Sequence, residues 1–283
     1  MIIDLHTHSY YSADGKLSIS ELLSFYSKGD IVALTDHETI AGWPEFKEEA
    51  LKKGIRPIFG VEWFIKNCCH ILSYFVSEIP QNFREFMIDR RNKERCSMHL
   101  LYDSAKLRFP SLSPYEEILA SEIHPENIVG MAALAKHISL NSGIAFKEIV
   151  TMMREEKGKL AEDVKPITFK PDELIIKIRE WNGISVLAHP FKHPIERSGR
   201  QNGIDVERKV RELAGLGIQG IELYSDGSSL PELEQLLGLA HDLGLFVSIG
   251  SDYHSKERGL NPSDLEELDD SVKNEVIRWL SYR

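Results

Sequence analysis

The sequence predicts an α/β fold in which a closed barrel of strands and helices carries a helical insertion. Short apolar runs alternate with amphipathic segments of helical length, and this alternation implies a parallel sheet with helices outside it. An open doubly wound sheet and a closed barrel both satisfy that pattern. Groups suited to binding one ligand occur on both the first and the last strand, and closure brings those strands together. The barrel is therefore favoured.

The predicted strands are short β-rich runs bounded by Gly, Pro and polar residues. They lie at residues 2–8, 31–37, 58–62, 70–72, 184–189, 218–224 and 245–249. All but the run at 218–224 lead into, or begin with, His, Asp or Glu. In folds of parallel strands the carboxyl ends of the strands bind ligands. These segments therefore predict one cluster of groups that hold Zn, Mn or Fe.

The intervening helices have recognisable start and stop signals. Ser18 and Glu21 have the spacing of a capping box, and Gly29 is expected to end that helix. Pro44 opens a helix that stops near Gly54. Further helices, each followed directly by a strand, are predicted at residues 174–181, 205–216 and 231–243.

The stretch between the fourth and fifth strands interrupts the alternation. It has the helical periodicity of apolar residues, as in Ile149 and Met153, and no convincing strand. Residues 1–80 and 167–283 are therefore assigned to a metal-binding barrel. Residues 81–166 are assigned to a helical insertion that caps the barrel mouth.

Composition excludes several classes of function. The chain has 283 residues, of which 42% are hydrophobic, and this is enough for a substantial core. Its formal net charge is −10, from 44 acidic and 34 basic residues, so long nucleic acid and anionic membranes are not expected as partners. A phosphate-bearing substrate must then be attracted locally, for example by bound metal. The oligomeric state leaves no readable pattern in the sequence.

The cysteines and the hydropathy pattern predict a soluble cytoplasmic protein. Cys68, Cys69 and Cys96 form no C-x-x-C pair, and their odd number argues against a disulfide framework. Cys68 and Cys69 are interpreted as strand residues rather than ligands. The first strand begins without a basic and apolar leader, and no uncharged run approaches the roughly 20 residues that span a bilayer.

The first motif is the pair His6 and His8. One residue separates them, so on a strand both rings face the same side, which suits two ligands of one metal. Asp4 lies on that face too, either as a direct ligand or as a partner that orients a histidine. Asp14 follows in a loop, where a ligand is favoured over a turn-forming residue without function.

The other candidates each allow a structural alternative. Glu62 directly follows an apolar run, where an unpaired carboxylate would be costly to bury, and its two oxygens can bridge two cations. His37 could simply cap the following helix, and His70 could be a core histidine. His189 precedes a proline that ends its strand. The one-residue spacing of the first pair recurs in Asp252 and His254.

Together these motifs resemble those of the PHP (polymerase and histidinol phosphatase) superfamily. They are Asp4-Leu5-His6-Thr7-His8-Ser9, Ser12-Ala13-Asp14-Gly15, Leu34-Thr35-Asp36-His37, Gly60-Val61-Glu62, Leu187-Ala188-His189-Pro190 and Gly250-Ser251-Asp252-Tyr253-His254. Their order and spacing cover nearly the whole chain. The resemblance implies a distorted seven-stranded (βα) barrel that binds up to three metals, commonly Mn, Fe or Zn, and hydrolyses phosphate esters.

The resemblance also implies how the candidate residues divide among the metals. Two or three divalent ions are the implied cofactors, with Glu62 bridging the first two sites. The implied sets are His6, His8, Glu62 and Asp252; Glu62, His70 and His189; and Asp14, His37 and His254. The implied catalytic residues are Glu62, His37 and His254.

Asp14 and the helical insertion are similar to the small phosphoesterase branch of the superfamily. That branch includes nucleoside 3′,5′-bisphosphate phosphatase and a 5′-to-3′ exonuclease acting on short RNA. Those enzymes usually carry an Arg-Pro-His stretch in the insertion, which helps to bind substrate phosphate. The nearest match here is Gly130-Met131-Ala132-Ala133-Leu134-Ala135. This departure weakens the case for a bisphosphonucleoside substrate and leaves the metal chemistry untouched.

The mechanism predicted from these groups needs no covalent nucleophile. Clustered divalent ions lower the pKa of a bridging water from about 15.7 towards 7, and the hydroxide would attack phosphorus in line with the leaving alcohol. Substrate anions need further cations. Arg91 and Arg95 lie four apart on a predicted helix and could clamp a phosphate, with a solvated helix face as an equal alternative. His193 and Arg197, just after His189-Pro190 and near the expected barrel mouth, are the other candidates for binding substrate phosphate.

The leading hypothesis is a metal-dependent phosphoesterase acting on a small phosphorylated metabolite, nucleotide or short oligonucleotide. Histidinol-phosphate phosphatase is a second enzymatic alternative. It shares the chemistry, but the insertion suggests that it does not share the same lid over the site. A catalytically silent metal-binding regulatory module is the alternative of a different class. That alternative predicts gaps among the nine ligand positions, and the sequence has none.

Overall fold

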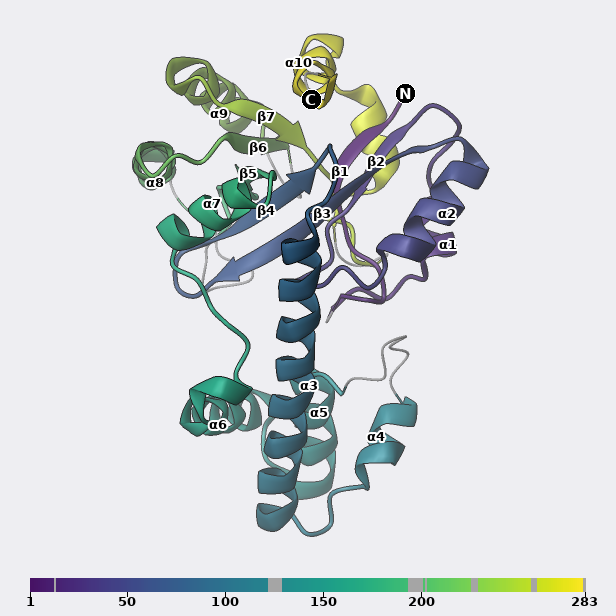
Figure 1. The fold of residues 1–283 in the computed structure, drawn as a ribbon, viewed down its shortest axis with the longest axis vertical. Coiled ribbons are helices and arrows are strands. Elements are labelled where there is room, and N and C mark those ends of the chain that lie inside the picture. Colours follow the sequence, from purple (N-terminus) through teal and green to yellow (C-terminus); the bar gives the residue numbers. More distant parts are fainter. Residues whose placement is uncertain are drawn as a thin grey trace. The chain divides into compact units, whose positions relative to one another are not determined.

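A computed structural model describes residues 1–12, 14–121, 129–192, 201, 203–224, 229–255 and 259–281. Within these residues, seven strands form one sheet in sequence order, which curls into a nearly closed barrel with helices outside it (Figure 1). The strands are β1 (Ile3–Thr7), β2 (Ile31–Leu34), β3 (Arg56–Ile65), β4 (Cys69–Phe75), β5 (Ile184–Leu187), β6 (Gly220–Tyr224) and β7 (Phe246–Ile249). The predicted α/β barrel is confirmed.

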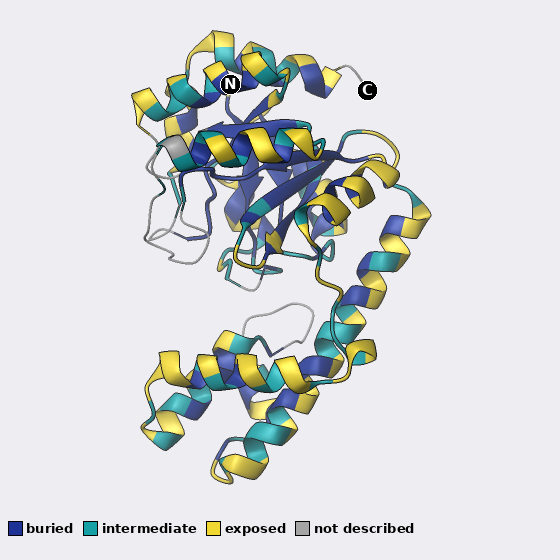
Figure 2. Ribbon diagram, turned by 90° about the vertical axis from the view of Figure 1, so that its left-hand side faces the viewer, coloured by how far each residue is buried: buried dark blue, intermediate teal, exposed yellow. Residues whose placement is uncertain are grey.

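The helices of the barrel cover its outer face. They are α1 (Ile19–Leu23), α2 (Trp43–Lys53), α7 (Pro171–Glu180), α8 (Gly203–Gly215), α9 (Leu230–Leu243) and α10 (Asp270–Ser281), with a 3-10 turn at Pro262–Glu267. Helix α2 packs on β3, α7 on β5, α9 on β6 and α10 on β7. Figure 2 shows the consequence of the amphipathic patterns: the strands are buried, and the helices bury one face and expose the other.

The predicted helix signals are mostly confirmed. The capping box of Ser18 and Glu21 is present, and Gly54 ends α2 in a left-handed conformation with φ 71°. The predicted end of α1 at Gly29 is wrong, because the helix already stops at Leu23. The next residue, Ser24, donates its hydroxyl to the carbonyl oxygen of Glu21 at 2.6 Å, and the chain continues as a series of turns.

Strand β4 departs from the predicted parallel sheet. It runs antiparallel to β3 and β5, whereas the remaining neighbouring pairs are parallel. The reason lies in the connection: β3 continues past Glu62 to Ile65, and only residues 66–68 precede β4, which is the length of a hairpin and not of a crossover. His70 pairs with Phe64 across this hairpin. An imidazole at the start of β4 therefore lies at the rim where the parallel strands end.

Backbone hydrogen bonds join the end of β1 to the segment that follows β7. The amide of Asp252 donates to the carbonyl of His6 at 2.8 Å, and the amide of His8 donates to the carbonyl of Tyr253 at 3.0 Å. First and last strands thus lie side by side. The ligand candidates of both strands can therefore belong to one site.

Gly250 lies at this closure, and we expect its replacement by Ala to be strongly destabilising. A Cβ there would overlap the Cβ of His6 and lie 2.8 Å from its backbone nitrogen and 3.0 Å from Glu222 Oε1. Because the backbone nitrogen and Cβ of His6 are fixed in strand β1, Gly250→Ala should lower the free energy of unfolding by about 3 kcal/mol. Urea denaturation measures this.

Gly238 provides the matched control for that measurement. It lies in α9, and a Cβ there meets nothing within 4 Å. Gly238→Ala should therefore raise stability by about 0.5–1 kcal/mol through its helix propensity. Equal effects of the two substitutions would contradict the close approach at the barrel closure.

Residues Arg84–Thr168 form a second compact unit, distinct from the unit of Met1–Phe83 and Phe169–Arg283. Its helices are α3 (Gln81–Arg108), which begins in the barrel unit, α4 (Tyr115–Ser121), α5 (Met131–Ser142) and α6 (Phe146–Lys159), with a 3-10 turn at Glu162–Val164. The described part of this unit contains no strand. The helices share a core of their own, with Leu101, Ile118, Leu134, Ile149 and Met153 among its members.

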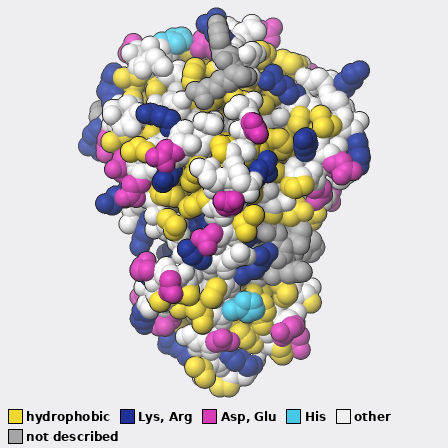
Figure 3. Space-filling view, viewed as in Figure 1, with side chains coloured by type: hydrophobic (Ala, Val, Ile, Leu, Met, Phe, Trp, Pro, Cys, Tyr) yellow, Lys and Arg dark blue, Asp and Glu magenta, His cyan; other side chains and the backbone are white. Residues whose placement is uncertain are grey.

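On the face drawn in Figure 3, basic and acidic side chains are interspersed over both units, with hydrophobic side chains between them. Among the described helices, none combines the length and the apolar character that a membrane span requires.

Candidate metal centre

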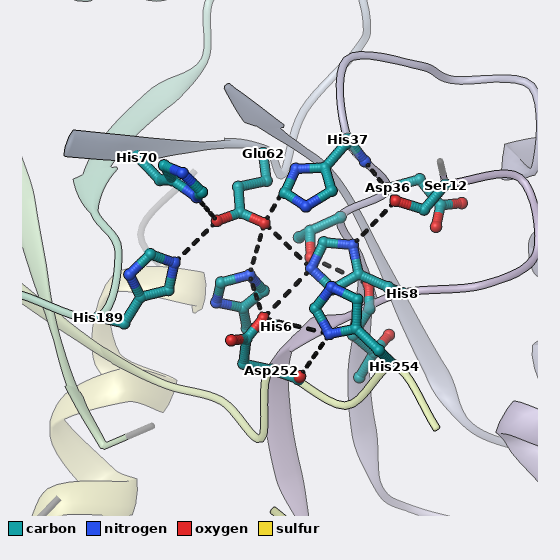
Figure 4. A network of polar contacts seen from close by, with 12 residues as sticks. His6, His8, Ser12, Asp36, His37, Glu62, His70, His189, Asp252 and His254 are labelled. Atoms are coloured by element: carbon teal, nitrogen blue, oxygen red, sulfur yellow. Dashed lines mark hydrogen bonds and ion pairs between the residues drawn. The ribbon is translucent and has the colours of Figure 1, made fainter. Parts of the chain in front are cut away.

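The structure brings all nine predicted ligands together at one end of the barrel. Figure 4 labels eight of them, all except Asp14. They come from the end of β1 and the loop after it, from the segment after β2, from β3, from the start of β4, and from the segments after β5 and β7. They are His6, His8, Asp14, His37, Glu62, His70, His189, Asp252 and His254.

Glu62 occupies the centre of this cluster. It is fully buried within β3, and five imidazoles surround its two oxygens. Oε1 lies 2.6 Å from His70 Nδ1 and 2.9 Å from His189 Nε2. Oε2 lies 3.1 Å from His6 Nε2, 3.0 Å from His8 Nε2 and 3.3 Å from His37 Nδ1. One carboxylate therefore touches the rings of all three predicted ligand sets.

Two aspartates contact the imidazoles of the cluster. Asp252 Oδ1 is 3.4 Å from His6 Nε2 and 3.4 Å from His8 Nε2. Asp14 Oδ1 is 3.5 Å from His37 Nε2 and 3.4 Å from His254 Nε2. The ring of His8 stacks on that of His254 with centroids 4.0 Å apart.

Ligand atoms that lie within 4.8 Å of one another form three groups. The groups are His6, His8, Glu62 and Asp252; Glu62, His70 and His189; and His8, His37 and His254. The first two contain the same residues as two of the predicted sets. The third has His8 in the place predicted for Asp14, whose carboxylate nevertheless lies within 3.5 Å of two of its rings.

The donor set fits divalent cations. His6 Nδ1 donates to Glu222 Oε1 at 2.9 Å, and His254 Nδ1 donates to the carbonyl of Asp252 at 2.7 Å, so each ring directs a lone pair on Nε2 into the cluster. The buried Nε2 atoms of His6, His8 and His254 and the Oε2 atom of Glu62 have no hydrogen-bond partner. When the rings are neutral, these atoms are all acceptors facing one another, so they need a positive charge between them, which a proton or a metal cation can supply.

The pKa values of the carboxylates suit this role. Burial acts to raise the pKa of Glu62, but the imidazoles around it, His37 and His6 first, hold that pKa well below its ordinary value. Burial likewise opposes ionisation of Asp252, and the ammonium of Lys192 and the ring of His6 hold its pKa well below the usual range. Both carboxylates are therefore ionised at neutral pH.

The pKa values of five of the imidazoles fall into two classes. Burial lowers the pKa of His37 to about 3 and also lowers those of His189 and His254, so these rings are neutral at pH 7. For His6 and His8 the burial effect is overcome by the neighbouring carboxylates. Glu222, Glu62 and Asp252 raise the pKa of His6 well above its usual value, and Asp252 and Glu62 raise that of His8 to about 9.

Metal binding is therefore expected to release protons. A raised pKa means that His6 and His8 hold protons at pH 7, and a cation must displace them, so about two protons per chain should appear on binding. For the same reason the apparent affinity should rise with pH up to about 9, the pKa of His8. A pH indicator measures the release when Mn²⁺ is added to metal-stripped protein at pH 7. His8→Asn should release about one proton fewer, and unchanged pH on binding would contradict the assignment.

Two of the site residues have strained backbones. His189 has φ 28° and Asp252 has φ 53°, both in the left-handed region that non-glycine residues avoid. Such conformations cost about 1–3 kcal/mol and persist only where surrounding structure imposes them. The amide of His189 donates to Glu222 Oε2 at 2.6 Å, and that of Asp252 is held by β1. These hydrogen bonds hold the strained backbone at both candidate ligands.

Three supporting residues surround the ligands, and two of them were not predicted. Glu222 on β6 is fully buried and bonds both His6 and His189. The signal was available, because Glu222 interrupts an apolar run just as Glu62 does. Lys192, which pairs with Asp252 Oδ2, gave no signal beyond its place in sequence. Asp4, for which two roles were open, accepts hydrogen bonds from the hydroxyl of Tyr26 and the amide of Ser251.

The predicted substrate-binding residues stay predictions. Arg91 and Arg95 lie on α3 in the helical unit, both partly exposed. Arg95 Nη1 donates to Asn92 Oδ1 at 3.3 Å. His193 and Arg197 lie outside the described residues.

Known proteins of two activities are similar to this chain along most of its length. It is 28% identical to a 5′-3′ exoribonuclease of Haemophilus influenzae over 258 residues, which make up 89% of each chain. It is 25% identical to a 3′,5′-nucleoside bisphosphate phosphatase of Chromobacterium violaceum over 274 residues, which make up 91% of this chain and 88% of that one.

Two solved structures share the fold. One is a protein of Bifidobacterium adolescentis described as a metal-dependent phosphoesterase, with a TM-score of 0.63 and 20% identity over 98% of this chain and 95% of that chain. The other is an amidohydrolase of Chromobacterium violaceum with bound sulfate, with a TM-score of 0.61 and 21% identity over 92% and 90% of the two chains. The PHP domain family model matches residues 4–158, more than half of the chain, and the protein therefore belongs to the PHP domain family.

Proposed function

We propose that this protein is a metal-dependent phosphoesterase that hydrolyses a phosphate ester of a small metabolite, nucleotide or short oligonucleotide. The observation that carries the proposal is the position of Glu62, whose two oxygens lie among five imidazoles with unpartnered ring nitrogens beside them. Similar proteins named as an exoribonuclease and a nucleotide phosphatase support it, because both names describe cleavage of a phosphate ester.

We assign two or three divalent ions, Mn, Fe or Zn, to the cluster. The first would be held by His6, His8, Glu62 and Asp252, and the second by Glu62, His70 and His189. Asp14, His37 and His254 would hold a third, with His8 close enough to share it. Mixed imidazole and carboxylate ligands accept several first-row metals, so the donor set alone fixes none of them.

When bound, such ions lower the pKa of water and stabilise negative charge on the phosphoryl oxygens. The residues of the chain supply the geometry. Glu222 and the Asp252 carbonyl fix the tautomers of His6 and His254, so that each Nε2 points into the cluster. His37 is neutral at pH 7 because its pKa is about 3, so it can bind a cation and does not act as a general acid.

The helical insertion is proposed to cap the site. The segment at 130–135 supplies no charged side chain, and Ala133, Leu134 and Ala135 are buried in the core of the helical unit. A bound phosphate would need cations from elsewhere, and Arg91, Arg95, His193 and Arg197 remain the proposed sources.

We propose a cytoplasmic location because the cysteines form no disulfide. Cys68, Cys69 and Cys96 are all free thiols, and free thiols are usual in a reducing compartment.

Hydrolysis of 4-nitrophenyl phosphate with added Mn²⁺ tests the proposed activity. Wild-type protein should hydrolyse it, and His6→Ala and Asp252→Ala should each lose nearly all of the rate. His241→Ala is the control, because that exposed ring lies 3.1 Å from Glu275 and outside the cluster. Equal rates in wild type and both ligand variants would exclude the metal mechanism.

A side-by-side comparison of natural substrates then identifies the class. We expect a nucleoside 3′,5′-bisphosphate or a short RNA to be hydrolysed faster than histidinol phosphate. Preference for histidinol phosphate would favour the alternative phosphatase. Metal binding without hydrolysis of any of the three would favour a regulatory module.

A further inference from the structure

Lys192 places a positive charge beside the metal cluster, where it pairs with Asp252 and has no role yet toward the substrate. Its Nζ pairs with Asp252 Oδ2, while Asp252 Oδ1 faces the rings of His6 and His8. Asp252 thus turns one oxygen to the predicted cation site and the other to the ammonium. The Lys192 side chain is 26% exposed, so its charged end lies between the buried cluster and solvent.

The fold holds the backbone of Lys192 in place. Its amide donates to the carbonyl of His189 at 2.9 Å, directly after that predicted ligand. The side-chain amide of Gln201 donates to the carbonyls of Pro190 at 2.8 Å and Lys192 at 2.9 Å. Gln201 in turn accepts from Lys209 Nζ at 3.1 Å. The turn that carries Lys192 is therefore built into the barrel.

We propose that Lys192 is a substrate-binding residue that makes the site prefer a terminal phosphate monoester over a phosphodiester. The proposal rests on the proposed phosphoesterase function. A terminal phosphate carries about −1.5 to −2 charges at pH 7, whereas a diester carries one. An ammonium acts on phosphate as a point charge, so its attraction for the monoester is up to about twice that for the diester.

The test compares 4-nitrophenyl phosphate with bis(4-nitrophenyl) phosphate in wild type, Lys192→Met and Lys192→Arg, each loaded with Mn²⁺. Lys192→Met should raise the KM of the monoester about tenfold and that of the diester about threefold or less, with smaller changes in kcat. The inhibition constant of inorganic phosphate should rise in parallel with the monoester KM. Lys192→Arg retains the charge and should keep most of the preference.

Lys273→Met is the matched control. Lys273 is a buried lysine of the same unit whose Nζ donates to the carbonyl of Glu266. Glu266 also pairs with the amino terminus, which precedes β1, so this lysine lies at the end of the barrel opposite the site. Its loss should leave the ratio of monoester to diester activity unchanged.

Three results would overturn the role of Lys192. They are an unchanged substrate ratio in Lys192→Met, an unchanged affinity for inorganic phosphate, and loss of bound Mn²⁺ in that variant. Loss of Mn²⁺ would mean that Lys192 holds Asp252 in place for metal binding and does not bind substrate. Calorimetric binding of phosphate to Mn²⁺-loaded protein needs no turnover. A wild type that binds phosphate through Lys192 but hydrolyses neither ester would therefore refute the proposed function and leave the binding role standing.

Discussion

Glu62→Gln is expected to abolish hydrolysis and to remove more than one metal ion. The neutral amide cannot offer two anionic oxygens, and Oε1 and Oε2 each belong to a different proposed metal site. Its amide nitrogen would also place hydrogens where His70 and His189, or His6 and His8, need a cation. Mutation of a residue that only orients a metal ligand lowers metal affinity or activity by about 10–100-fold. Loss of a ligand shared by two metals should therefore reduce kcat/KM by about 10³-fold or more.

The measurement combines activity with metal content after dialysis against a fixed free Mn²⁺ concentration. Glu62→Asp, which keeps the charge on a shorter side chain, should retain part of both. Glu45→Gln makes the same chemical change at a carboxylate that accepts from the hydroxyl of Tyr11 at 2.9 Å, and it should leave both unchanged. A Glu62→Gln variant with full metal content would show that this carboxylate bridges nothing.

The composition of the candidate site was predictable because most of its residues lie at the end of an apolar strand signal. Short apolar runs fix where strands end, and strand ends of one barrel share a rim, so the sequence alone could place His6, Glu62 and His189 together. Closure of the barrel followed from the same logic, since ligands on the first and last strands had to meet. Hydrogen bonds from Asp252 and His8 now account for that closure.

Other features depend on contacts that periodicity does not encode. The direction of β4 was misread because an apolar run looks the same in either direction, although the short link after Ile65 did contain the information. After the early end of α1, Tyr26 donates to Asp4 at 2.7 Å, a contact between distant residues that periodicity does not encode. The position of Lys192 depends on Gln201, nine residues later, and no local pattern announces such a contact.

Glu222 is not a candidate ligand, but it holds two candidate ligands in place. It lies on β6, fully buried, and its two oxygens contact residues of two different proposed metal sites. Oε1 accepts from His6 Nδ1 at 2.9 Å, and Oε2 accepts from the backbone amide of His189 at 2.6 Å. The first bond fixes a tautomer, and the second holds a strained backbone with φ 28°. The geometry therefore predicts that one side chain supports both sites.

We expect Glu222→Gln to weaken two metal-binding steps together, each by about 10–100-fold. An amide has one acceptor oxygen, so it can receive the proton of His6 or that of His189 but must oppose the other with its own N–H group. Glu222→Ala leaves both donors unpaired and should also cost about 1–3 kcal/mol of stability per donor. Stepwise calorimetric titration with Mn²⁺ resolves the binding steps, and thermal unfolding follows the stability.

Ser248→Ala is the appropriate control for Glu222, because Ser248 is its register partner on β7 and equally buried. That substitution should leave both binding steps within about threefold of wild type. Weakening of a single step in Glu222→Gln would mean that the carboxylate supports only His6 or only His189. Weakening of both binding steps in Glu222→Gln, with Ser248→Ala unaffected, would establish that a buried acid outside the ligand set couples the two sites. The unaffected Ser248 variant would show that the barrel interior as a whole is intact.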